Sequence, residues 1–244
     1  MTLIEKYLSS TLKKINIKGR QPVYFLIHNH AGLYGPNRVA IQNGLWGMIA
    51  TLRHYPYALE DLWISIITYG GGWNSSFGAQ QIIPLQDLAE FDSNKINLIN
   101  GEGGLNTLGA AITLLCECID KEVISNSSRG RPFNDDLPHI IIVCSDKPDD
   151  DVDFALKEIN KRKIGAVIIC YHGSPSSNSV FYKEALIERA KSLPKINNLS
   201  HLLIIFDRNY NQLFKYISEL LLFGVDFEKL HIPVKPSELE ILCI

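Results

Sequence analysis

The feature that most constrains this chain is a series of short, almost wholly apolar runs that alternate with segments of helical periodicity. The runs cover residues 23–27, 62–69, 139–144, 166–170 and 202–206. Strands that are buried on both faces have this composition. Alternation with helices of about a dozen residues indicates βαβ crossovers. We therefore predict an α/β fold with a doubly wound, mostly parallel sheet and helices on both of its faces.

The segments between the runs predict the helices and one sheet edge. Apolar residues recur at helical spacing over 3–14, 38–54, 107–123, 150–161, 180–191 and 210–222. A short strand at 81–85 contains Pro84, which cannot donate to a ladder hydrogen bond and so favours an edge position. We expect it to form a hairpin with 62–69, as one antiparallel edge strand.

Composition indicates an ordinary globular chain and excludes several function classes. Lys plus Arg number 24 and Asp plus Glu 26, a net charge of −2, so no bulk charge attracts nucleic acid or an anionic membrane. No run approaches the roughly 18 apolar residues of a spanning helix. Five cysteines without framework spacing, and a start without a signal-peptide pattern, lead us to expect a cytoplasmic location.

No linker or repeat divides the sequence, so we expect a single domain over 22–223. An N-terminal extension would precede it at 1–21. A C-terminal tail at 224–244 would pack on the domain.

Several strings carry a resemblance to a known family. They are PVYFLIHNHAG, NGLWGMIATLRHYPYALEDLWISIITY, QQIIPLQDLAEF, GGLNTLGAAITLLCECIDKEV and HIIIVCSDKPDDD. Together with the element order, they resemble the von Willebrand factor A domain, and within it the bacterial tellurite-resistance (TerY-like) branch. The resemblance implies the doubly wound fold predicted above and a recognition edge at the carboxyl ends of the strands.

The chain departs from that family at the family's metal-ion-dependent adhesion site. There, an Asp-x-Ser-x-Ser motif, a Thr and an Asp supply the hard oxygen ligands that Mg²⁺ prefers. The corresponding positions are His28, His30 and Gly32, then Asn106 or Thr107, and finally Asp146. Since only Asp146 is clearly kept, we expect a degenerate site that holds no Mg²⁺, and no cofactor.

The two histidines leave an alternative open. His28 and His30 are two residues apart at the end of a strand, so both can reach the same side of the sheet. With Asp146, and with His172 as a fourth ligand, they could hold a softer metal than Mg²⁺. The other interpretation is that polar residues refilled a lost metal site and hydrogen-bond to the loop backbone.

Three loops have competing interpretations. Asp149, Asp150 and Asp151 are expected to cap the helix that they precede. The glycine-rich loop before residue 107 could cradle a phosphate, but no Walker lysine follows it. Serines at 174–177 are expected to cap a helix rather than to form a hydrolase triad, because the nucleophile-elbow motif is absent. Trp73, in the insertion GGGWNSSFG, is a candidate partner contact or packs on its own sheet.

We therefore expect a non-enzymatic interaction module that binds another protein through the carboxyl-end edge. The resemblance implies a bacterial stress-response or defence system, with the partner encoded in the same system. The expected partner-binding residues are His28, Asn29, His30, Asn106, Thr107, Asp146, His172 and Trp73. The alternatives are a metal-assisted hydrolase using His28, His30 and Asp146, and regulation by phosphorylation of the serine-rich loops.

Overall fold

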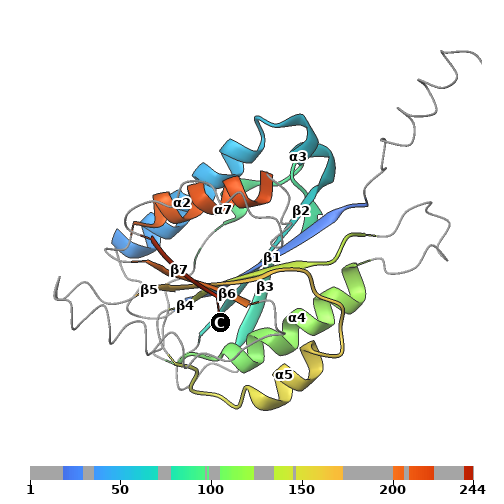
Figure 1. Ribbon diagram of the computed structural model, residues 1–244, viewed down its shortest axis with the longest axis vertical. Helices are drawn as coiled ribbons and strands as arrows, with labels where there is room; N and C mark the ends of the chain where they lie inside the picture. Colours follow the sequence, from blue (N-terminus) through green and yellow to red (C-terminus); the bar gives the residue numbers. More distant parts are fainter. Residues whose placement is uncertain are drawn as a thin grey trace, which may run out of the picture.

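A single sheet organises the molecule (Figure 1). The computed structural model describes residues 19–29, 36–70, 78–96, 98, 105–123, 135–144, 147–172, 200–205, 209–222 and 239–243. Within these ranges the strand order is β3-β2-β1-β4-β5-β6-β7. The strands are β1 (Gln21–His28), β2 (Leu62–Tyr69), β3 (Ala79–Asp87), β4 (His139–Cys144), β5 (Val167–His172), β6 (Ser200–Ile205) and β7 (Leu239–Cys243).

The parallel centre of the sheet confirms the predicted fold class. β1 pairs in parallel with β2 on one side and with β4 on the other, so that Val23 lies opposite both Ile64 and His139. β5 and β6 continue the parallel order. All residues of β1 after Gln21 are buried, as expected for a strand covered on both faces. Each of the five apolar runs forms a strand.

The two edges of the sheet are antiparallel. β3 pairs with β2 in the predicted hairpin, and Pro84 is exposed on this edge strand. The prediction of one antiparallel edge strand was incomplete, because β7 pairs antiparallel with β6 at the opposite edge. This second edge strand lies in the segment predicted only as a C-terminal tail. Five residues close to Pro233 and Pro236 give too short a pattern to predict a strand.

Two helical layers cover the faces of the sheet, with α2, α3 and α7 on one side and α4 and α5 on the other (Figure 1). The predicted helices at 38–54 and 107–123 are present with shifted ends, and the one at 210–222 has the predicted bounds. The segment predicted at 150–161 forms a helix only from Asp153. A short helix that the sequence did not predict begins at Pro56, where proline suits the first turn. The bounds are α2 (Pro36–Leu52), α3 (Pro56–Asp61), α4 (Leu108–Glu122), α5 (Asp153–Ile159), α7 (Tyr210–Leu222) and the 3₁₀ helix η2 (Ser93–Lys95).

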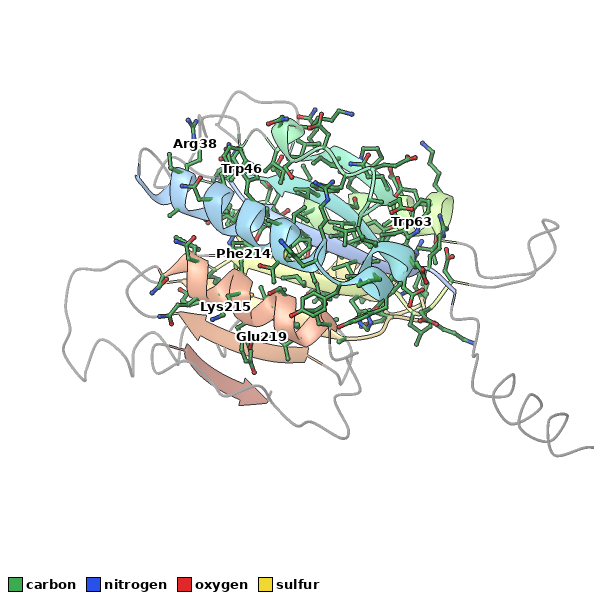
Figure 2. All side chains as sticks on the ribbon, turned by 90° about the horizontal axis from the view of Figure 1, so that it is seen from above. Arg38, Trp46, Trp63, Phe214, Lys215 and Glu219 are labelled. Carbon is green, nitrogen blue, oxygen red and sulfur yellow. The ribbon has the colours of Figure 1, made fainter. Side chains whose placement is uncertain are left out.

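Each layer has its own apolar core. Phe25 of β1 contributes to the core beneath α2 and α7, and its ring centroid lies 6.4 Å from that of Phe214. Leu26 faces the other way, toward a core that includes Leu115 of α4. Gly44 lets α2 and α7 approach closely, because a Cβ there would lie 2.5 Å from Cδ2 of Phe214. In Figure 2, Phe214 lies between these two helices.

Two predicted helices, at 3–14 and 180–191, lie outside the described residues, as do the serines at 174–177 and residues 101–104 of the glycine-rich loop. Among the helices that are described, none has the length and apolar character needed to cross a membrane.

Candidate functional site

At the carboxyl ends of β1 and β2, two rings stack beneath the surface. The imidazole of His28 lies 5.1 Å from the phenol ring of Tyr69, with 15° between the ring planes. His28 is 1% exposed, and its Nε2 lies 3.4 Å from the carbonyl oxygen of Leu105. Burial raises the pKa of Tyr69 well above its usual range. The His28 side chain therefore joins two strands to the segment before α4 and does not reach the surface.

Thr107 holds the base of the hairpin between β2 and β3. Its hydroxyl donates to the carbonyl oxygen of Gly78 and accepts a 3.0 Å hydrogen bond from the amide of Gly70. The same Gly70 amide also lies 3.1 Å from the Gly78 carbonyl oxygen. Thr107 is the N-cap residue of α4, yet its side chain caps no amide of that helix. Its hydroxyl is committed to the hairpin instead.

Glycine is required at position 70 for two reasons. Its φ is +107°, a conformation that L side chains rarely adopt. A Cβ at this position would also lie 3.0 Å from the carbonyl oxygen of Asn29. The amide of Asn29 donates a 2.6 Å hydrogen bond to the carbonyl oxygen of Tyr69. The chain leaving β1 is therefore fastened directly to the end of β2.

The N-terminus of α4 is capped by a residue from another part of the chain. The two carboxylate oxygens of Asp150 accept hydrogen bonds from the amides of Gly109, at 3.0 Å, and Ala110, at 2.9 Å. These amides have no partner inside the helix, and the negative charge also suits the helix dipole. Gly109 permits the approach, since a Cβ there would lie 2.6 Å from the carbonyl oxygen of Asp151.

Asp149 forms a second link between the same two segments. Its Oδ2 accepts a 2.7 Å hydrogen bond from the amide of Asn106, and its own amide donates to the Asn106 carbonyl oxygen at 2.9 Å. The expectation that all three aspartates cap their own helix was therefore wrong for Asp149 and Asp150. Only Asp151 bonds locally, to the amide of Asp153. One short helix does not need three carboxylates before it. This excess is the signal in the sequence that some of them bond to another segment.

The structure brings four of the predicted site residues together: His28, Asn29, Asn106 and Thr107 line the junction described above. His28, Asn29 and Asn106 are buried, so their place is beneath the edge. His30, Trp73 and Asp146 lie outside the described residues. Of His172, the structure describes only the backbone, which is paired with Ile205 at the end of β5.

Beside this junction, the described surface is acidic and carries one aromatic ring. Asp149, Asp151 and Asp153 are exposed, and Lys147 is the exposed cation next to them in sequence. Phe154 is 62% exposed, the most exposed large apolar side chain among the described residues. Carboxylates around an exposed ring are suited to contact a basic and partly apolar partner surface.

The amino-end side holds a polar network that the sequence analysis missed. Arg20 forms an ion pair with Asp135, with Nη2 and Oδ2 2.5 Å apart, and its guanidinium lies 4.3 Å from the ring centroid of Trp63. The hydroxyl of Tyr24 donates to Glu122 Oε2 at 3.1 Å, and Gln81 Nε2 donates to Glu122 Oε1 at 3.0 Å. These residues are far apart in sequence, so no local motif indicates the network.

A cavity of about 440 Å³ opens next to this network, and its lining includes Asp120, Leu137, Pro138, Arg162 and Lys163. Asp120 and Arg162, both in its lining, form an ion pair with Oδ2 and Nη2 2.5 Å apart. No group of three or more His, Cys, Asp or Glu side chains within the described ranges has the arrangement of a metal site. His30 and Asp146, two ligands of the alternative metal site, lie outside those ranges.

Comparison with known proteins identifies the fold. No family model and no curated protein matches the sequence. Among solved structures, a von Willebrand factor type A protein from Catenulispora acidiphila superposes with a TM-score of 0.53 at 13% identity, over 82% of this chain and 42% of that one. Proximal thread matrix protein 1 from the mussel byssus gives a TM-score of 0.56 at 10% identity, over 84% and 48%.

The pilus adhesin SpaC from Lactobacillus rhamnosus GG gives a TM-score of 0.58 at 8% identity, over 84% of this chain and 30% of that one. This chain thus spans less than half the length of each of the three structures. At these identities the likeness shows the fold alone: the chain has a von Willebrand factor A fold, as the sequence resemblance implied.

Proposed function

We propose that this chain is a non-enzymatic interaction module that binds a partner protein through the carboxyl-end edge of its sheet, without a conventional Mg²⁺ site. The fold supports an interaction role in general, since proteins of this fold include an adhesin. Open α/β sheets also place their ligand sites at this edge. Its setting, which the sequence resemblance suggests, is a bacterial stress-response or defence system in the cytoplasm, with the partner encoded in the same system.

The metal-free part of the proposal rests on the contacts of the side chains at two positions where the family has metal ligands. His28 stands where the family has its first carboxylate, and its ring is buried against Tyr69. Thr107 is one of two candidates for the family's threonine, and its hydroxyl already bonds to Gly70 and Gly78. Mg²⁺ requires hard oxygen ligands in near-octahedral geometry, and neither side chain offers a free oxygen to such a cage.

Hydrogen bonds join the loops at the carboxyl-end edge of the sheet. Asp149 links the segment after β4 to Asn106, and Asp150 links it to the start of α4. Thr107 links the start of α4 to the β2–β3 hairpin. In this proposal the buried residues position the loops, and the exposed residues Asp153 and Phe154 join His30 and Asp146 in contacting the partner.

The proposal is tested by quantitative co-purification from the bacterium that encodes this chain. The bait carries His30→Ala with Asp146→Ala, or Asp153→Lys with Phe154→Ala. We expect each edge pair to lower recovery of the partner at least about tenfold, which corresponds to about 1.4 kcal/mol. Addition of EDTA should leave recovery by the wild-type bait unchanged, and the melting temperature of each variant should stay near that of the wild type.

The matched control is Lys161→Ala with Lys163→Ala, two exposed side chains near the amino-end side of the sheet. Replacing them should leave recovery of the partner unchanged, because charges away from an interface contribute little to its affinity. The proposal is wrong if the lysine pair reduces recovery while both edge pairs retain it. Loss of the partner in EDTA would contradict the metal-free part alone.

A further inference from the structure

The outer face of α2 is unusually free of charge for an exposed helix. Between Val39 and Leu52 the sequence contains no charged residue. The exposed positions of this stretch form one stripe along the helix, which we call the α2 stripe: Val39, Asn43, Trp46, Gly47, Ala50 and Thr51. A helix that is apolar on all sides is usually covered on all sides.

Large apolar side chains gather at this stripe. Six large hydrophobic side chains are exposed among the described residues, and four of them lie on α2 or just after it: Val39 at 51%, Trp46 at 38%, Tyr55 at 40% and Tyr57 at 46%. Figure 2 shows Trp46 on the side of α2 away from Phe214 and α7. A concentration of exposed apolar side chains of this kind marks an interaction surface.

Gly47 supplies an independent observation. A Cβ at Gly47 would meet nothing within 4 Å, so the packing of this chain does not require glycine there. Glycine in the middle of a helix is less stable than alanine, because it loses more backbone freedom on folding. Gly44, on the same helix, is explained by the contact with Phe214. The open notch at Gly47 is explained if a second backbone approaches α2 from outside.

We propose that the α2 stripe is the contact between two copies of this chain, whose α2 helices cross at Gly47 about a two-fold axis. In such an interface each residue near the axis faces its own counterpart. A charged residue would therefore face a like charge, and the stripe has none. A surface for an unlike partner gains specificity from complementary charge, which this face does not offer.

Positions on either side of Gly47 also match under this symmetry. Asn43 and Thr51 each lie four residues from Gly47, about 6 Å along the helix at 1.5 Å per residue. An antiparallel pairing centred on Gly47 brings Asn43 of one copy level with Thr51 of the other. Both side chains are exposed and uncharged in the single chain, and this pairing buries them. The inference concerns a different surface from the carboxyl-end edge and does not depend on the function proposed for that edge.

The test is sedimentation equilibrium of the full chain at protein concentrations from about 1 to 100 µM, the range in which contacts of modest affinity form. We expect the wild type to be a reversible dimer. Gly47→Glu places two carboxylates at the crossing and should raise the dimer dissociation constant at least about a hundredfold. Because glutamate is a better helix former than glycine, the melting temperature of the dilute monomer should not fall.

The matched control is Asn211→Glu, which adds the same charge at an exposed position of α7, in the same layer. This variant should dimerise like the wild type. A wild type that is monomeric at about 100 µM would overturn the proposal and leave the stripe to an unlike partner. A dimer that Gly47→Glu does not weaken would also overturn it, since the two copies would then meet through another surface.

Discussion

The two helical layers that cover this sheet differ in the character of the residues that they expose. In the α4 and α5 layer, the helix start is capped by Asp150, and the exposed positions of α4 are the charged residues Glu117, Asp120 and Lys121. In the α2 and α7 layer, the inner face of α2 is packed as tightly, but its outer face is uncharged and exposes Trp46. The exposed face of α4 is therefore charged, whereas the outer face of α2 is uncharged and partly apolar.

Core packing and interaction surfaces therefore produce different sequence patterns in a helix. Hydrophobic residues at helical spacing on α4 are accounted for by the core beneath them. On α2, hydrophobic residues at helical spacing on the inner face, such as Leu45 and Met48, are likewise accounted for by the core. The core does not account for the absence of charged residues on the outer face of α2. The predictions below test where the two layers are alike and where they differ.

Truncating one leucine in each core should cause a large loss of stability and tests whether the inner faces of α2 and α4 are equally well packed. Leu45 and Leu115 are both 0% exposed, one in each core. Leu45→Ala and Leu115→Ala should each lower the free energy of unfolding by about 2–5 kcal/mol, because each leaves a cavity. Urea denaturation measures both. If Leu45→Ala lowers the free energy of unfolding far less than Leu115→Ala, the inner face of α2 is loosely packed and the two layers do not share equally tight cores.

His139 of β4 is half-buried and makes the stability of this chain depend on pH. His139 lies on the same side of β4 as Ile141 and Val143, which belong to the α2 and α7 core. Its Nδ1 accepts a 2.9 Å hydrogen bond from the amide of Ala166, and burial lowers its pKa from 6.5 to about 4. The folded state therefore favours the neutral ring, while the unfolded chain takes up a proton below pH 6.5.

The contribution of His139 to the free energy of unfolding is consequently full above pH 6.5 and is lost as the pH falls from 6.5 to about 4. The loss should amount to about 3 kcal/mol, at 1.36 kcal/mol for each pKa unit. In His139→Asn, whose amide oxygen can still accept from Ala166, this part of the pH dependence should disappear. Equal pH slopes for the variant and the wild type in chemical denaturation would refute the assignment.

The two glycines of α2 should respond in opposite directions. Gly44→Ala should destabilise the chain by about 1–3 kcal/mol, because the new methyl group overlaps Phe214. Gly47→Ala should stabilise the monomer by about 0.5–1 kcal/mol, because it meets open space and favours the helix. Thermal unfolding of dilute protein measures both changes. Destabilisation by Gly47→Ala would show that this face is already packed within one chain.

In the α4 and α5 layer, we expect the capping of α4 by Asp150 to contribute to stability. Asp150→Ala leaves the amides of Gly109 and Ala110 without their acceptor and should cost about 0.5–2 kcal/mol. Asp153→Ala, which removes a neighbouring exposed carboxylate, should cost less than about 0.5 kcal/mol. If the two substitutions cost the same, general charge and not the cap would explain the effect of Asp150.

Divalent cations should leave the stability of the chain almost unchanged, because neither layer would depend on them. Millimolar Mg²⁺ or Mn²⁺ should not raise the melting temperature, whereas a site at hundredfold excess over its Kd would add about 2.7 kcal/mol. A rise of several degrees that Asp146→Ala abolishes would refute the metal-free proposal. It would also show that the carboxyl-end edge is held by an ion in addition to its hydrogen bonds.

The fold could be predicted from the sequence because its signals are local. Runs such as 23–27 and 62–69 are apolar on both faces, and Pro84 marks an edge. The junction at the edge could be predicted only in outline. His28 and Thr107 were found as family positions, but their partners Tyr69, Gly70 and Gly78 come from other segments. Asp149 and Asp150 act across about forty residues of sequence, which local capping rules do not consider.

The closed base of the β2–β3 hairpin has a consequence for how this chain can be altered. Gly70 and Gly78 are fastened to each other and to Thr107, so the ends of residues 71–77 are fixed whatever lies between them. Once a loop's ends are fixed, doubling its length costs only about 0.6 kcal/mol of chain entropy. This position is therefore suited to grafting peptides or to insertion during evolution, with the rest of the domain left as it is.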